Sequence, residues 1–204
     1  MELKGVTLPG YKIGEYMLVL NPHEDLRNKI TEVRKEFNRE YKIASGGGSK
    51  PYLALALFTQ YEMMEERIVN NLKNIALGFP PVKIELKDFG SFPSHSIFIN
   101  VLSKMPIQKL VRQIRSETQK LMKLNEDNKP YFIMEPHMTI ARKLKPWQYE
   151  KGWLEYSNKH FTGRFIADGM LLLKRHPGDK SWQILKRFEF LNLPVATKQG
   201  ELFS

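Results

Sequence analysis

The chain has 204 residues, of which 42% are hydrophobic and 26% charged, a balance that is ordinary for a folded globular protein. It contains no cysteine, which excludes disulfides, thiolate nucleophiles and cysteine-ligated zinc. Lysine and arginine exceed aspartate and glutamate by ten charges, an excess that favours anionic partners such as nucleic acid, nucleotides or membrane surfaces and fits a solubilising surface equally well.

No targeting or membrane-spanning segment is expected from the sequence. The first residues lack the apolar centre of a signal peptide, and the longest apolar run, 53–58, is too short to cross a bilayer. Together with the absence of cysteine, these features predict a cytoplasmic protein that has no membrane partner and no obligate protein partner. No histidine and carboxylate cluster has ligand spacing, so neither a metal nor a cofactor is expected.

Hydrophobic periodicity and turn residues predict alternating helices and strands. In chain order these are a strand over 15–20, a helix that Asn21 caps and that runs to 41, a strand from 52, a helix over 61–76, strands over 82–88 and 96–101, a helix over 106–121, a strand at 137, a helix over 147–156, and strands over 163–174 and 182–190. The order helix, strand, helix, strand, strand thus occurs twice.

A strand-favouring stretch that reads Glu-Pro-His-Met-Thr-Ile-Ala-Arg contains His137 and Thr139 two residues apart. In an extended chain these two side chains lie on one face, together with Ala141. Met138 and Ile140 then point to the opposite face, towards a hydrophobic core. The pattern therefore predicts a strand with one buried face and one polar face.

The same pattern occurs once more upstream, because residues 50–56 match residues 135–141 at a constant offset of 85. The core-facing leucines are retained, but Tyr52, Ala54 and Ala56 take the places of the histidine, the threonine and the alanine. An internal duplication explains this repeat most simply. We expect the two motifs on neighbouring strands whose polar faces border one central cleft.

The duplication predicts a single two-lobed α+β domain spanning 1–204. Lobe one is expected over about 15–101 and lobe two over about 106–190, with short tails at both ends. Each lobe should contain the order helix, strand, helix, strand, strand.

These motifs resemble those of the 2H phosphoesterase superfamily, in particular its 2′-5′ RNA ligase-like and RNA cyclic phosphodiesterase group, over residues 15–190. The resemblance implies two α+β lobes around a cleft, each giving one His-x-Thr or His-x-Ser motif from a strand. The second motif is intact as His137 and Thr139 within Pro-His-Met-Thr-Ile-Ala-Arg. The first motif is degenerate, because Tyr52 and Ala54 occupy its two functional positions.

The activity implied by the resemblance is metal-independent cleavage of 2′,3′-cyclic or 2′-5′ phosphodiesters in RNA ends or nucleotides. One imidazole takes a proton while the other donates one, and each hydroxyl binds a phosphate oxygen, so His137 and Thr139 are the catalytic candidates. A tyrosine, with a pKa near ~10, can act only as the acid, and impaired catalysis is expected. The alternative is a non-catalytic module that binds RNA or nucleotide phosphate, in which Tyr52 stacks on a base.

Further candidates for substrate binding surround the two motifs. His95 precedes the predicted strand over 96–101 and could approach the cleft or stand in a surface turn. Arg142, Lys143 and Lys145 would form a basic rim for phosphates at the end of the second motif strand. Two aromatic residues at 131 and 132 could stack on a base or serve packing alone.

Overall fold

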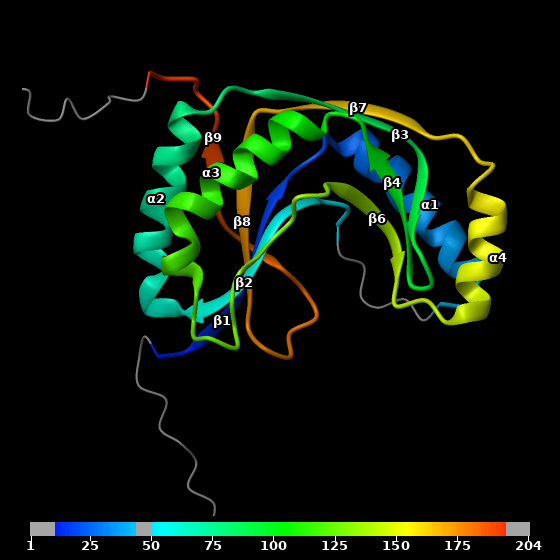
Figure 1. The fold of residues 1–204 in the computed structure, drawn as a ribbon, viewed down its shortest axis with the longest axis horizontal. Helices are drawn as coiled ribbons and strands as arrows, with labels where there is room; N and C mark the ends of the chain where they lie inside the picture. The colour runs from blue at the N-terminus through cyan, green and yellow to red at the C-terminus, as the bar shows by residue number, and fades with distance from the viewer. Residues whose placement is uncertain (1–10, 44–49, 195–204) are drawn as a thin grey trace, which may run out of the picture.

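The structure of the protein is a computed structural model that describes residues 11–43 and 50–194 (Figure 1). Among these residues the helices are α1 (Glu24–Glu40), α2 (Glu65–Gly78), α3 (Lys104–Met122) and α4 (Pro146–Tyr156), with a 3-10 turn at Glu62–Met64. The strands are β1 (Ile13–Leu20), β2 (Leu53–Tyr61), β3 (Val82–Phe92), β4 (Ser96–Val101), β5 (Tyr131–Phe132), β6 (His137–Arg142), β7 (Thr162–Ala167), β8 (Gly169–Arg175) and β9 (Gln183–Glu189). The predicted α+β class is confirmed, whereas most of the predicted tails falls outside the described residues.

The strands form two antiparallel sheets. Sheet A has the order β5-β2-β1-β8-β9, and sheet B has the order β6-β4-β3-β7. Each sheet takes strands from both halves of the chain, since β1 of sheet A pairs with β8, and β3 of sheet B pairs with β7. The segments 15–101 and 106–190 therefore do not coincide with the two sheets.

The helices cover the outer sides of the sheets in pairs. Helices α2 and α3 pack against each other and against strands of sheet A, while α1 and α4 pack against strands of sheet B. Figure 1 shows α2 and α3 together on one side of the molecule and α4 on the other. One hydrophobic core connects both sheets, with Leu55 of sheet A and Ile99 of sheet B fully buried in it.

Helix α1 begins two residues later than the sequence predicts. Its N-cap is His23, whose Nδ1 accepts a hydrogen bond from the backbone N–H of Leu26 at 3.3 Å. Asn21, the predicted cap, instead accepts a hydrogen bond through Oδ1 from Arg27 at 3.2 Å. Pro22 therefore precedes the helix and does not occupy its first position.

Strand β2 contains a β-bulge directly after Ala54. Ala54 lies opposite Val19 of β1, but Ala56 lies opposite Leu18, so that Leu55 is an extra residue without a partner in β1. A bulge of this kind interrupts the alternation of side chains between the two faces.

Strand β6 contains the corresponding bulge, 85 residues later. Thr139 lies opposite Phe98 of β4, and Ala141 lies opposite Ile97, which leaves Ile140 as the extra residue. The two motif strands thus share a hydrogen-bonding irregularity as well as a sequence pattern.

These bulges correct one prediction for each motif. Ala56 and Ala141 were expected on the polar face, but their exposed fractions are 0% and 6%, and both belong to the hydrophobic core. Because the extra residue shifts the alternation by one position, only the first two polar-face positions of each motif lie outside the core.

Candidate active site

His137 opens strand β6 of sheet B, where its imidazole is partly buried among aromatic side chains. The ring centroid lies 5.0 Å from that of Phe92 in an edge-on arrangement and 4.9 Å from that of Phe98. Phe98 also lies directly across from Thr139 in the neighbouring strand. These contacts restrict the rotation of the imidazole and keep it on the same side of the sheet as Thr139.

A single hydrogen bond selects the tautomer of the neutral His137 ring. Its Nδ1 lies 2.8 Å from the backbone carbonyl oxygen of Glu135. Since a carbonyl oxygen can only accept, Nδ1 carries the hydrogen and Nε2 keeps a lone pair. The neutral ring can therefore accept a proton at Nε2, and the protonated ring can donate it again, without loss of the hydrogen bond that orients it.

Thr139 is held through its backbone by Arg34 of helix α1. The guanidinium donates to the carbonyl oxygen of Thr139 from Nε at 2.9 Å and from Nη2 at 2.6 Å. Burial, and secondarily the positive charge of Arg142, lower the pKa of Arg34 to about 10, so the side chain remains charged at neutral pH. Strand β6 is an edge strand of sheet B, so these two bonds tie a sheet edge to helix α1.

Sequence reasoning missed Arg34, Phe92 and Phe98. Nothing in the spacing of the helix indicates that Arg34 meets the edge of a strand more than a hundred residues later. Phe98 lies in the predicted strand over 96–101, but Phe92 lies beyond the predicted end of the strand over 82–88, which the structure extends to Phe92. Only the non-local pairing of β4 with β6 brings the imidazole to these rings.

The first motif lies in the other sheet. Tyr52 directly precedes β2, and with Ala54 it is partly buried against a small apolar cluster separate from the main core. The buried members of this cluster are Val19, Leu171 and Leu173, and Met17 and Trp182 also pack on it.

Burial raises the pKa of the Tyr52 phenol above its ordinary value, with the nearby positive charge of Arg27 acting in the opposite direction. The phenol therefore keeps its proton at neutral pH. It can donate a hydrogen bond or a proton, but it cannot serve as a base. The methyl group of Ala54 can donate neither a hydrogen bond nor a proton.

The expectation that the two motifs lie on neighbouring strands is wrong in terms of hydrogen bonding. Strand β2 pairs with β1 and, opposite Ala56, with Phe132 of β5 in sheet A, whereas β6 pairs with β4 in sheet B. Strands β2 and β6 nevertheless contact each other where the two sheets meet. Tyr52 directly precedes one of these two contacting strands, and His137 is the first residue of the other.

His95 lies in the exposed turn between β3 and β4, where its Nδ1 is 2.9 Å from the carbonyl oxygen of Pro93. Its ring stacks on Phe92 at a centroid distance of 6.2 Å, and Phe92 in turn contacts His137 at 5.0 Å. The sum of these two centroid distances limits the separation of the two imidazole centroids to 11.2 Å at most. The phenyl ring of Phe92 lies against both imidazoles.

The predicted basic rim consists of exposed side chains at the end of β6 that is remote from His137. Arg142 is the last residue of the strand and lies opposite Ser96, two residues along β4 from the partner of Thr139, or about 7 Å at the usual rise of a strand. Lys143 adopts a left-handed φ of 56°, and Lys145 caps helix α4 by donating its backbone N–H to Oε1 of Gln148 at 2.9 Å. The rim therefore lies beyond Thr139, at the opposite end of the strand from His137.

Within the part of the chain that the structure describes, no group of three histidine or acidic side chains could hold a metal ion. None of the described helices is long and apolar enough to cross a membrane.

Two surface depressions lie away from the two motifs, since neither is lined by His137 or Tyr52. The central cleft therefore remains a prediction.

Comparison with known proteins identifies a family. The family model for the 2′-5′ RNA ligase superfamily matches residues 22–179. A protein of Geobacillus kaustophilus named "Putative phosphoesterase GK0864" is 25% identical over 179 residues, which cover 85% of this chain and 95% of that protein. A Bacillus licheniformis protein with a similar name is 26% identical over 140 residues, which cover 64% of this chain and 72% of its own length.

Solved structures share the fold. TT0787 of Thermus thermophilus superimposes with a TM-score of 0.60 at 16% identity, covering 87% of this chain and 98% of that one. LigT of E. coli complexed with 3′-AMP gives a TM-score of 0.57 at 14% identity, covering 88% and 98%. LigT has also been solved with NADP+ and with phosphate.

Proposed function

This chain belongs to the 2′-5′ RNA ligase superfamily, and from that premise we propose that it binds RNA ends or nucleotides and cleaves their 2′,3′-cyclic or 2′-5′ phosphodiesters with impaired acid–base catalysis. One observation carries this proposal. The imidazole of His137 is fixed through Nδ1, so that Nε2 can exchange a proton on the face shared with Thr139. The nucleotide complexes of LigT support the class of ligand.

In the proposed reaction His137 acts as the general base. Its Nε2 accepts a proton from water as the water oxygen attacks phosphorus, and the bond from phosphorus to one ribose oxygen breaks. The hydroxyl of Thr139 donates a hydrogen bond to a non-bridging phosphate oxygen, where negative charge increases in the transition state. Phe92 and Phe98 position the imidazole for this step.

The departing ribose oxygen needs a proton, and here the degenerate first motif limits the rate. Tyr52 can supply that proton only as a weak acid, because burial raises its pKa. Ala54 supplies no hydrogen bond to phosphate, so transition-state stabilisation on this side is lost. The reaction then depends on Tyr52 or on water for its acid step.

Residues around the two motifs would bind the rest of the substrate. Arg142, Lys143 and Lys145 are suited to phosphates further along an RNA strand, and His95 to a group beside Phe92. The charge excess and the absence of cysteine are in keeping with a cytoplasmic RNA partner.

A second candidate function is binding without turnover. The observation that favours it is the pair Tyr52 and Ala54 beside the apolar cluster of sheet A, which suits contact with a nucleobase better than proton transfer. In this case His137 and Thr139 would hold phosphate only.

The test is hydrolysis of a 2′,3′-cyclic mononucleotide by the parent protein and by His137→Ala. We expect the variant to lose about 10²–10⁴-fold in rate, the usual contribution of one general acid or base. The binding of a 3′-mononucleotide, measured in parallel, should change far less. Equal rates in both proteins, with binding retained, would instead support the non-catalytic module.

A further inference from the structure

A groove of about 480 Å³ lies at the edge of sheet A, between the C-terminal half of α3 and strand β5. It is not part of the candidate active site. Its basic and aromatic lining residues are Arg115, Lys120, Lys123, Lys129, Tyr131 and Phe132.

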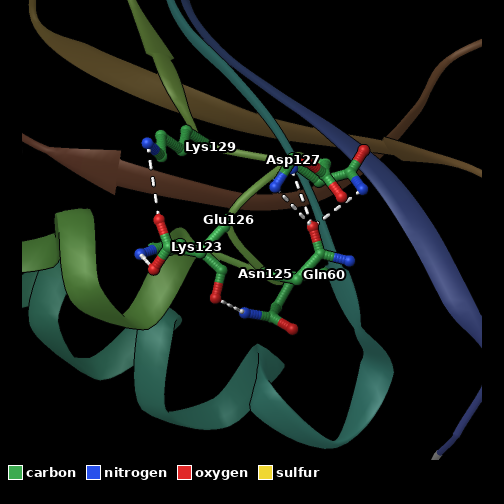
Figure 2. A network of polar contacts seen from close by, with 7 residues as sticks. Gln60, Lys123, Asn125, Glu126, Asp127 and Lys129 are labelled. Atoms are coloured by element: carbon green, nitrogen blue, oxygen red, sulfur yellow. Dashed lines mark hydrogen bonds and ion pairs between the residues drawn. The ribbon is translucent and has the colours of Figure 1, made fainter.

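The wall of the groove is a loop held in a defined shape (Figure 2). The amide of Gln60, a buried residue of β2, donates to the carbonyl oxygens of Leu121 and Lys123 at 2.8 and 3.1 Å. Oδ1 of Asn125 accepts from the backbone N–H groups of Asp127 and Asn128 at 3.1 and 2.8 Å. The groove therefore exists before any ligand binds, which lowers the entropic cost of binding.

The groove carries an excess of positive charge. Glu126 forms ion pairs with Lys123 and Lys129, as Figure 2 shows, and so partly neutralises these two lysines. Among residues 11–43 and 50–194, Arg115 and Lys120 form no ion pair, and no carboxylate lines the groove. Two exposed cations are thus available to an anionic ligand.

An aromatic side chain stands beside these cations. Tyr131 is 67% exposed although it belongs to a strand, because β5 is the edge strand of sheet A. Its backbone position is fixed by pairing with Leu57 of β2. The neighbouring Phe132 packs against the core, so Tyr131 alone offers a ring face to a ligand.

We propose that this groove binds single-stranded RNA, with a base stacked on Tyr131 and phosphates bound by Arg115 and Lys120. Cations that follow a backbone, combined with an exposed aromatic ring, are the usual elements of single-strand binding. The choice of RNA as ligand rests on the proposed function. Tyr131 precedes His137 by six residues, so the Cα atoms of the two residues are at most about 21 Å apart, the length of a fully extended chain. One RNA strand can therefore end at His137 while an internal segment occupies the groove.

The test measures fluorescence anisotropy with an RNA of about 12 nucleotides that ends in a 3′-hydroxyl, so that no cleavable group is present. Tyr131→Ala should weaken binding roughly 5- to 150-fold, the loss expected for one stacked base. Arg115→Glu combined with Lys120→Glu should weaken binding and reduce the slope of log K against log salt by about 1.4, since each phosphate contact contributes about 0.7.

A matched control uses the same helix and the same change of charge. Lys109 and Arg112 are exposed on α3 but do not line the groove, so Lys109→Glu with Arg112→Glu should leave the salt slope within error. Equal weakening by both double variants would overturn the proposal in favour of non-specific attraction by net charge. Unchanged binding in Tyr131→Ala, with thermal unfolding also unchanged, would overturn it as well.

Hydrolysis of a 2′,3′-cyclic mononucleotide separates this proposal from the proposed function. A mononucleotide is too small to reach both sites, so Arg115→Glu combined with Lys120→Glu should turn it over at the parent rate. If that activity is present and the longer RNA binds no more tightly than a dinucleotide, the groove proposal fails alone. If the activity is absent and the groove variants still weaken RNA binding, the groove proposal stands and the catalytic one fails.

Discussion

Leu55 and Ile140 occupy equivalent places in the two motif strands, as the extra residue of a β-bulge in each. The strands paired with them correspond too, because Leu-Val-Leu-Asn ends at Asn21 and Ile-Phe-Ile-Asn ends at Asn100. The sheet orders β2-β1-β8-β9 and β6-β4-β3-β7 place these strands alike. This agreement in hydrogen bonding supports an internal duplication with evidence that is independent of the seven matched residues.

Because of the bulge in β2, we expect different losses of stability on substitution of two alanines that simple alternation would place on one face. Ala56→Thr adds volume and a hydroxyl to a fully buried position and should lower the free energy of unfolding by about 1–3 kcal/mol. Ala54→Thr, at a partly exposed position, should cost about 0.5 kcal/mol or less. Urea denaturation of both variants decides this, and equal costs would contradict the register described for β2.

Restoring the first motif should restore the rate. Tyr52→His with Ala54→Thr supplies a second imidazole and a second hydroxyl, and we expect 2′,3′-cyclic phosphodiesterase activity to rise by about 10²–10⁴-fold. Adding His137→Ala should abolish the gain, since both imidazoles act on one phosphate. A fast parent enzyme that is inactivated by His95→Ala and unaffected by the restoring changes would identify His95 as the second proton carrier.

Arg34 should matter for both stability and activity. Arg34→Ala removes two charge-assisted hydrogen bonds to the carbonyl oxygen of Thr139 and should lower the free energy of unfolding by about 1.5–3 kcal/mol. Because Thr139 is then less well placed, kcat should fall more than KM rises. Arg39→Ala, an exposed change on the same helix, serves as the control and should alter neither quantity appreciably.

The buried phenol of Tyr16 should make the folded protein less stable in alkaline solution. Burial, followed by its hydrogen bond to Glu65 at 2.6 Å, raises the pKa of this phenol well above its ordinary value. The unfolded phenol ionises near pH ~10 while the folded one does not, so its contribution is complete below that pH and declines above it. Urea denaturation between pH 8 and 11 should show a flatter decline for Tyr16→Phe than for Tyr11→Phe, which alters an exposed ring.

The basic rim should act through salt-sensitive contacts. Lys143→Glu with Lys145→Glu should reduce the salt slope for binding of a short RNA by about 1.4, as expected for the loss of two phosphate contacts. A short RNA is used so that the groove beside Tyr131 does not contribute. An unchanged slope would show that these lysines only solvate the surface.

Most helices and strands could be predicted because their apolar periodicity is local. The predicted strand over 163–174 nevertheless proves to be two strands in two sheets, β7 and β8, separated by Asp168. A Cβ on Gly169 would meet the carbonyl oxygen of Phe188 at 2.3 Å, so this close approach requires glycine. Periodicity continues across such a change of sheet, and only the non-local pairing reveals it.

The candidate site was predictable to a similar extent. The places of His137 and Thr139 on one face follow from alternation, whereas the end of that face at Ile140 depends on a bulge that no spacing encodes. Strand β5 was missed because two residues carry no periodicity, and its pairing with β2 is non-local. The contact from Arg34 depends on the packing of a helix from one half of the chain on a strand from the other.

The exchange of strands between the halves has a consequence for synthesis on the ribosome. Met17 in β1 pairs with Leu173 in β8, 156 positions later, so the interior of sheet A cannot close until β8 has been translated. Until then β1 exposes an unpaired edge, a form of nascent chain that is prone to aggregation. Pairings this distant in sequence also slow folding, so the completion of sheet A should be a slow step.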